Sequence, residues 1–271
     1  MTGIETKNLS PGVPLQQSTF LRVSGVSVRF GGINALTDVS LDVPQNRVTS
    51  VIGPNGAGKT TLFNAISGFY PVAEGSIRFQ EHDLLAQPAS RRAHLGISRT
   101  FQNLALFPGM SVLENIKLGV HPHLRAGLLA GMVYLGKARR EEIEATARID
   151  ESVLDLLDIR PYRDKPVSGL PYGVLKRIEL ARALVMSPRL LMLDEPFAGM
   201  NHTEKGRMAA HIRRIIDTTD VTALLIDHHM ESIMAMSDQV TVLNFGKVIA
   251  SGTPDEIKRD KAVIDAYLGQ D

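Results

Sequence analysis

The glycine-rich segment of residues 53–60 reads GPNGAGKT and fits the pattern G-x-x-x-x-G-K-[ST]. In such a loop, successive backbone N–H groups turn inward around phosphate oxygens, and the following helix N-terminus adds partial positive charge. Lys59 would reach the β- and γ-phosphates, and the Thr60 hydroxyl would bind Mg²⁺. The segment therefore predicts a nucleotide-binding site formed by Gly53, Pro54, Asn55, Gly56, Ala57, Gly58, Lys59, Thr60 and Thr61.

A second chemically useful group follows the apolar run LLML at residues 190–193, which ends in the adjacent carboxylates Asp194 and Glu195. Asp194 would hold Mg²⁺ directly or through water, and Glu195 would polarise the water that attacks the γ-phosphate. Taken alone, the string favours a solvated acidic turn at a strand end. Beside a phosphate loop it favours the catalytic interpretation. The guanine-nucleotide motifs D-x-x-G and N-K-x-D do not occur in the sequence, so we do not expect a GTPase. A small-molecule kinase would fit the phosphate loop alone but not the second half of the chain.

The elements that must position these residues follow from the hydrophobic pattern. A β-branched run at residues 47–52 precedes the phosphate loop, and a helical pattern follows it. Ser111 and Glu114 form a capping-box pattern that opens a further helix. The predicted strands are 21–30, 39–43, 47–52, 75–80, 99–102, 190–193, 221–226, 240–244 and 248–251, and the predicted helices are 58–67, 112–118, 137–157, 174–186, 204–216 and 230–236.

The alternation of strands with helices at both ends of the chain predicts an α/β fold. We expect a P-loop NTPase core, with a mixed sheet, an antiparallel β-subdomain and an inserted helical subdomain. The predicted organisation is a flexible tail over 1–19 and one ATPase domain over 20–271. Within that domain we expect a nucleotide-binding core over 20–102 and 166–256, the helical subdomain over 103–165, and a C-terminal helix over 257–271.

Composition excludes several classes of function. The 30 basic and 29 acidic residues give a formal charge of +1, so nothing in the sequence indicates a nucleic-acid surface. The absence of cysteine excludes disulfides, thiolate metal sites and a cysteine nucleophile. The longest nearly apolar run, Ala126 to Gly136, is far shorter than the ~20 residues that span a bilayer. Residues 1–19 show no secretory signal pattern, and we expect a cytoplasmic protein.

The phosphate loop, the acidic pair and three further residues follow one another in the same order as motifs of the ABC transporter ATPase family. The chain resembles this family over about residues 20–269, and the three further residues are Phe30, Gln102 and His228. The resemblance implies that Phe30 stacks on adenine; an edge-strand core aromatic is the alternative. Gln102, in the string RTFQN, would contact Mg²⁺ and link the nucleotide to the helical subdomain. His228 would hydrogen-bond the γ-phosphate. With His229 it could instead form a metal pair, for which no third ligand is evident.

Two motifs depart from the family pattern. The family signature is usually LSGGQ, and the string here is Leu170, Pro171, Tyr172, Gly173 and Val174. In the family this segment closes the γ-phosphate site of the opposite subunit, so we expect the contact in trans to survive but weaken. The family D-loop usually carries aspartate where this chain has Asn201, which can hydrogen-bond but carries no charge. If two different subunits pair, their two sites could be unequal.

These departures, the insert over 121–159 and the ending AYLG at 266–269 resemble the branch that powers branched-chain amino-acid importers. The resemblance implies an ATP-hydrolysing importer subunit that uses ATP and Mg²⁺ for branched-chain or other small amino acids or related polar solutes. Its partners would be a second ABC ATPase subunit, two membrane permease subunits and, indirectly, an external solute-binding protein. It would lie in the cytoplasm, peripheral on the inner face of the cell membrane.

Two other functions compete with this interpretation. The ATPase of an ABC exporter or lipid-transport complex would carry similar core motifs. A soluble ABC ATPase acting on nucleic acid is disfavoured, because the chain has one phosphate loop, no room for a long coiled coil and a balanced charge.

Overall fold

One of the two sheets of the fold is antiparallel. The computed structural model describes residues 19–100, 104–119, 146–147 and 149–268. Within these residues the sheet has four strands in the order β2-β1-β4-β5. Valine and leucine alternate with polar residues along β2, which buries one face and exposes the other. The strands are β1 (Thr19–Phe30), β2 (Ile33–Pro44), β4 (Glu74–Phe79) and β5 (His82–Asp83).

The predicted phosphate loop and the acidic pair lie at strand ends of a second sheet. Its described strands follow the order β10-β9-β3-β8-β7-β6, parallel except for β10, which runs antiparallel to β9. The carboxyl ends of β3, β7 and β8 therefore meet at one edge, where open α/β sheets bind ligands. The strands are β3 (Val48–Ile52), β6 (Ile97–Arg99), β7 (Leu190–Asp194), β8 (Thr222–Ile226), β9 (Gln239–Asn244) and β10 (Lys247–Gly252).

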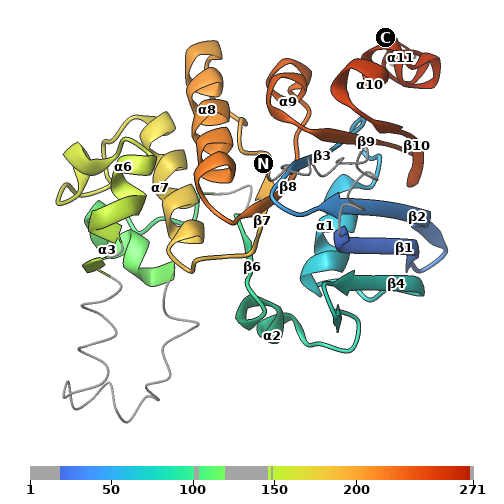
Figure 1. The fold of residues 1–271 in the computed structure, drawn as a ribbon, viewed down its shortest axis with the longest axis horizontal. Helices are drawn as coiled ribbons and strands as arrows, with labels where there is room; N and C mark the ends of the chain where they lie inside the picture. Colours follow the sequence, from blue (N-terminus) through green and yellow to red (C-terminus); the bar gives the residue numbers. More distant parts are fainter. Residues whose placement is uncertain (1–18, 101–103, 120–145, 148, 269–271) are drawn as a thin grey trace, which may run out of the picture.

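Helices lie on both faces of the second sheet (Figure 1). The capping box predicted at Ser111 is present and opens α3. Gly68 ends α1 in the left-handed conformation, which glycine adopts readily. The helical segments are α1 (Lys59–Ser67), α2 (Ala89–His94), α3 (Val112–Lys117), the π-helical η2 (Ile149–Val153), α6 (Leu154–Leu156), the 3₁₀ turn η3 (Arg160–Tyr162), α7 (Tyr172–Leu184), α8 (His202–Thr218), α9 (Met230–Met236), α10 (Pro254–Arg259) and α11 (Lys261–Leu268).

Alternate residues of β7 belong to two apolar clusters. Leu190 and Met192 pack with the antiparallel sheet and α1. Leu191 and Leu193 pack with α7, α8 and α9. The sheet is thus covered on both faces, which explains why its strands read as unbroken apolar runs.

The C-terminal prediction is wrong in one respect, because the helix expected over 257–271 is two helices. α10 ends at Arg259, and the backbone of the following Asp260 is extended. The Asp260 Oδ1 accepts hydrogen bonds from the N–H groups of Ala262 (2.8 Å) and Val263 (3.2 Å). This carboxylate therefore stops one helix and begins α11. Residues 269–271 lie outside the described residues.

α7, predicted as part of the nucleotide-binding core, also contacts the helices of the predicted helical subdomain over 103–165. α7 lies with α3 and α6, away from the antiparallel sheet (Figure 1). Arg177 of α7 donates to the carbonyl of Leu157 (3.0 Å), and Arg182 donates to that of Ala105. Other elements also differ from prediction. β2 begins at Ile33 and not at residue 39, the strand expected at 99–102 is β6 at Ile97–Arg99, and β5 and α2 were not predicted. Of the helix expected at 137–157, only residues 146–147 and 149–157 are described.

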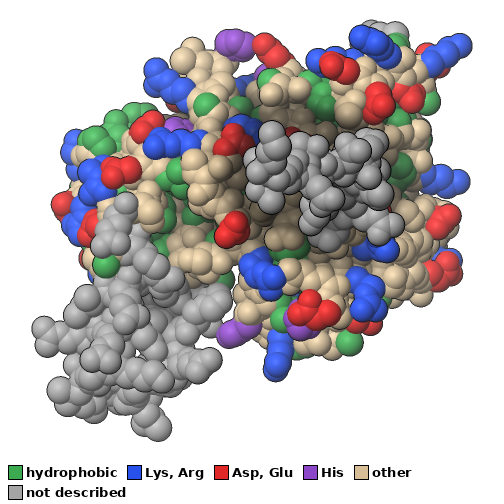
Figure 2. Space-filling view, in the orientation of Figure 1, with side chains coloured by type: hydrophobic (Ala, Val, Ile, Leu, Met, Phe, Trp, Pro, Cys, Tyr) green, Lys and Arg blue, Asp and Glu red, His purple; other side chains and the backbone are tan. Residues whose placement is uncertain are grey.

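Basic and acidic side chains are interspersed over the face shown in Figure 2, in keeping with the formal charge of +1. In the described part of the chain, no helix is long and apolar enough to cross a membrane. The predicted tail up to residue 18 and the apolar run at 126–136 lie outside the described residues.

Candidate active site

The phosphate loop joins β3 to α1 in a conformation that requires glycine at two positions. Gly53 has φ 150°, and a Cβ there would lie 2.1 Å from the carbonyl oxygen of Leu243. Gly58 has φ 101°, and its Cβ would lie 2.7 Å from Leu36 Cδ2. Gly58 is also the N-cap of α1 and supplies no side-chain cap. The N–H groups of the first helical turn therefore face the loop without a capping side chain, the arrangement that binds phosphate.

Lys59 is buried at the start of α1. Its Nζ donates to the carbonyl oxygens of Gly53 (2.7 Å) and Pro54 (2.9 Å). Burial lowers the pKa of Lys59, while the negative charges of Glu195 and Asp227 act in the opposite direction. The ammonium group thus lies in a carbonyl-lined loop near two carboxylates, where an anionic ligand would favour its charged form.

Asp194, the last residue of β7, forms a buried ion pair that the sequence did not reveal. Its Oδ2 lies 2.7 Å from Nη2 of Arg99, and the side chains are 6% and 8% exposed. Arg99 ends β6 and also donates through Nη1 to Asn64 Oδ1 (2.8 Å) and Ser67 Oγ (3.0 Å) of α1. One guanidinium therefore links α1, β6 and the predicted Mg²⁺ ligand.

Glu195 follows with a left-handed backbone, φ 48°, which is strained for a residue with a side chain. Its N–H donates to the carbonyl of Ile226 (2.9 Å), which fixes the turn against the end of β8. Glu195 lines a cavity of about 490 Å³ with the phosphate-loop residues from Asn55 to Thr61. The predicted base and the predicted phosphate cradle therefore face the same space.

Asp227 accepts backbone hydrogen bonds in the loop after β8. The sequence did not single it out as a site residue. It is fully buried. Its Oδ1 accepts from the N–H groups of His228 (2.7 Å) and His229 (2.8 Å), and its Oδ2 accepts from that of Phe197 (3.1 Å). The signal lay in the string LLIDHH, where an acidic residue directly follows a buried strand.

The two histidines that follow have different surroundings. His228 Nδ1 lies 3.9 Å from Glu195 Oε1, so the structure brings these two predicted residues together. His229 instead caps α9, accepting from the N–H of Ser232. Within the described residues, no group of three or more His, Cys, Asp or Glu could hold a metal ion. The alternative of a histidine metal pair therefore gains no third ligand there.

Phe30 is 42% exposed at the end of β1, so its alternative assignment as a core aromatic is wrong. Its ring meets Tyr70 edge-on, with centroids 4.9 Å apart. The other predicted contact, Gln102, lies outside the described residues.

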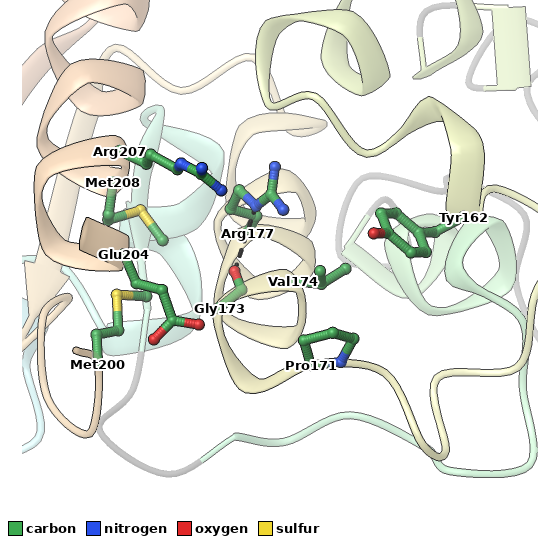
Figure 3. A pocket seen from close by; sticks show the side chains of 9 residues that line it. All are labelled: Tyr162, Pro171, Gly173, Val174, Arg177, Met200, Glu204, Arg207 and Met208. Atoms are coloured by element: carbon green, nitrogen blue, oxygen red, sulfur yellow. Dashed lines mark hydrogen bonds between the residues drawn. The ribbon is translucent and has the colours of Figure 1, made fainter. Parts of the chain in front are cut away.

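The signature residues lie apart from the phosphate loop. Pro171, Gly173 and Val174 line a separate cavity of about 170 Å³ between α7 and α8 (Figure 3). Val174 is only 3% exposed, and the Gly173 carbonyl accepts from Arg177 Nε (3.3 Å). Within one chain, the segment at 170–174 therefore does not line the phosphate-loop cavity.

Asn201 is the N-cap of α8. Its Oδ1 accepts from the N–H of Glu204 (3.0 Å), and its own N–H donates to Glu204 Oε2 (3.0 Å). This reciprocal pair satisfies two N–H groups at the helix start. The predicted D-loop residue thus caps a helix of its own chain.

The C-terminal helix approaches the start of the phosphate loop. Burial raises the pKa of Tyr267, on α11, to about 12, and the nearby Gly53 backbone acts in the opposite direction. The Tyr267 side chain also packs against the apolar cluster that contains residues of α7, α8 and α9.

A phosphate loop at the carboxyl edge of a parallel sheet, with an acidic strand end beside it, defines the class of P-loop nucleoside triphosphatases. Within this class, the chain belongs to the ABC transporter family, whose model matches residues 36–198. A second model, described as branched-chain amino acid ATP-binding cassette transporter, matches residues 247–271. The chain is therefore an ABC ATPase, a nucleotide-binding transporter subunit that hydrolyses ATP.

Curated relatives match over nearly their whole length. The chain is 41% identical to the high-affinity branched-chain amino acid transport ATP-binding protein BraF of Pseudomonas aeruginosa, covering 92% of this chain and 98% of the relative. It is 39% identical to the protein LivG of the same description from Escherichia coli, with the same coverage.

Solved structures agree. An ATP-binding cassette of an ABC transporter in its ADP conformation superposes with a TM-score of 0.81 at 30% identity, covering 93% of this chain and 99% of that one. A nucleotide-free cassette superposes with a TM-score of 0.80 at 31% identity, with coverages of 93% and 100%. The predicted fold class and family resemblance are thereby confirmed.

Proposed function

We propose that this chain powers the import of branched-chain or related small amino acids, as the ATP-hydrolysing subunit of a membrane ABC importer. The observation that carries the proposal is the 41% identity to BraF over 98% of that protein's length. The match of residues 247–271 to a model of the same transport class supports it independently of the ATPase core.

The site suggests a division of labour for hydrolysis. Lys59 would exchange its carbonyl partners for phosphate oxygens, beside the uncapped start of α1. Glu195 would orient the attacking water and accept its proton, and His228, 3.9 Å away, would hydrogen-bond the γ-phosphate. Phe30, exposed at the end of β1, would contact the base. Gln102 would connect the nucleotide to the helical layer.

Mg²⁺ would be held by the Thr60 hydroxyl, the Asp194 carboxylate and the Gln102 amide. These oxygen donors suit a hard cation that keeps only a few protein ligands and shares phosphates. The structure fits this assignment, because Arg99 holds Oδ2 of Asp194, while no hydrogen bond from a described residue reaches Oδ1. Bound Mg²⁺ would neutralise charge on the β- and γ-phosphates during phosphoryl transfer.

In this proposal, a second ABC ATPase subunit completes the nucleotide site. The segment at 170–174 would close the γ-phosphate site of a second ABC ATPase subunit, and the D-loop around Asn201 would lie beside it. Two membrane permeases would bind the pair on the inner face of the cell membrane and receive solute from an external binding protein. The separation of this segment from the phosphate-loop cavity of the same chain supports the assignment.

Uptake of radiolabelled leucine, isoleucine and valine by cells lacking this chain tests the transported substrate. Uptake should fall in the deletion strain and return with the wild-type chain, but not with Glu195→Gln. Unchanged uptake in the deletion strain would contradict the substrate assignment.

The purified protein tests the chemistry separately. Glu195→Gln should bind ATP like the wild type and lose at least about 10²-fold of its hydrolysis rate, because the proton acceptor is gone. Lys59→Ala should show no ATP binding in the same titration. Hydrolysis by Glu195→Gln at the wild-type rate would show that another group is the base.

A further inference from the structure

The hairpin between β9 and β10 places an exposed aromatic ring at the phosphate-loop cavity. Phe245 is 84% exposed, the highest value among the large exposed hydrophobic side chains of the described residues. It lines the cavity of about 490 Å³ that contains the phosphate loop and Glu195. A large apolar side chain that is exposed yet faces a ligand cavity points to contact with a ligand.

The local backbone does not favour phenylalanine at this position. Phe245 and Gly246 are the two central residues of the hairpin turn, with φ 45° and φ 74°. Two-residue turns with positive φ at both positions favour Asn-Gly or Asp-Gly. A bulky side chain in the left-handed region is strained. A residue that breaks its local rule and packs little within the chain is expected at functional positions.

Backbone hydrogen bonds fix the hairpin tip beside the site. The N–H of Gly246 donates to the carbonyl of Ala57 in the phosphate loop (3.0 Å), and its carbonyl accepts from the N–H of Thr37 in β2 (2.8 Å). The strands β10 and β2 lie on the same side of the molecule in Figure 1. The backbone next to Phe245 is therefore held against the loop that would hold the phosphates.

The composition of the cavity wall fits a nucleotide. Lys59, Thr60 and Glu195 supply its charged and polar lining. Ile33, 73% exposed, and Phe245 supply large apolar surface. A nucleotide carries its charge on the phosphates and its apolar surface on the base, so the two kinds of lining match its two ends.

We infer that Phe245 contacts the base of the bound nucleotide, adding a second aromatic side chain from the β9–β10 hairpin to that of Phe30 on β1. The inference rests on the proposed nucleotide site. Stacking on an aromatic face is available to every base, so Phe245 adds affinity without selecting adenine over guanine.

Phe245→Asn separates this role from a structural one. Asparagine suits the turn better, so the melting temperature should stay the same or rise. The Kd for ATP and for ADP should rise about fivefold, the effect of losing one aromatic contact. The Kd for inorganic tripolyphosphate, which has no base, should not change. Phe245→Tyr, which keeps the ring, should retain wild-type affinity for all three.

Phe107→Ala is the matched control. This phenylalanine is 52% exposed between β6 and α3 and does not line the cavity, so nucleotide affinity should be unchanged. If the wild-type chain does not bind ATP, the proposed nucleotide site itself fails. If it binds ATP and Phe245→Asn binds ATP equally well, only the inference fails. If Phe245→Asn loses ATP-dependent dimerisation but keeps its ADP affinity, the ring contacts a second copy and the inference is overturned.

Discussion

Replacement of Arg99 by methionine should destabilise the fold strongly, because it leaves Asp194 buried without its cation. The two side chains are 8% and 6% exposed, and their charged atoms lie 2.7 Å apart. Removing one partner of such a pair costs about 3–5 kcal/mol, mostly because an uncompensated charge stays buried. For a chain of this size, each kcal/mol lowers the melting temperature by about 2–4 °C, so the expected fall is about 6–20 °C.

Urea unfolding monitored by circular dichroism measures this loss. Arg22→Met is the matched control, because Arg22 pairs with Asp42 at 3.0 Å but the side chains are 54% and 53% exposed. The control should cost less than about 1 kcal/mol, as exposed pairs do. The double variant Arg99→Met with Asp194→Leu should recover most of the stability, because no charge then stays buried.

Two results would contradict this reasoning. A loss below about 1 kcal/mol in Arg99→Met would mean that water reaches Asp194 and replaces the guanidinium. A double variant as unstable as Arg99→Met would instead assign the loss to the bonds that Arg99 makes to Asn64 and Ser67.

Other predictions concern caps, protons and the phosphate loop. Asn201→Ala should lower the free energy of unfolding by about 1 kcal/mol and Asn201→Asp should not, because aspartate also caps helices; urea midpoints of both variants test this. Burial lowers the pKa of His211 below its unfolded value of 6.5, against the opposing charge of Asp158, so the unfolded state binds the proton more readily and stability falls as pH drops below about 6.5. The loss between pH 7.5 and 5.5 should be smaller in His211→Gln, and equal losses would contradict the assignment. Gly58→Ala should weaken ATP binding at least about tenfold in an ATP titration, because its Cβ would lie 2.7 Å from Leu36 at φ 101°.

The elements around the phosphate loop were predictable because their signals are local. A buried parallel strand reads as an unbroken apolar run, and β3 and β7 lie within one residue of their predicted ends. The helix predicted over 58–67 is α1, from Lys59 to Ser67. The phosphate loop needs glycine, lysine and serine or threonine at fixed spacing, so this pattern alone located the loop in the sequence.

The contacts that complete the site were not predictable, because they join distant segments. Arg99 and Asp194 are 95 residues apart and meet only because β6 pairs with β7. Asp227 reaches the turn after β7 through Phe197, and Phe245 reaches the phosphate loop through its neighbour Gly246. Hydrophobic periodicity does not reveal these contacts, because they depend on the order of the strands in the sheet. The break at Asp260 was missed for a local reason: an aspartate can cap a new helix where the apolar pattern continues.

The departures from the family motifs do not all have the same explanation. Val174 is 3% exposed, so an apolar residue there agrees with its packing between α7 and α8. Pro171 is the N-cap of α7 and supplies no side-chain cap where the family has a hydroxyl, and its carbonyl accepts from the N–H groups of Val174 (2.9 Å) and Leu175 (3.1 Å). Asn201 differs, because aspartate would cap α8 equally well and packing does not require the amide. Only the loss of its charge distinguishes it from the family residue. We therefore expect Asn201→Asp to leave stability unchanged and to alter ATP turnover only when a partner subunit is present; a change in turnover of the isolated monomer would refute this.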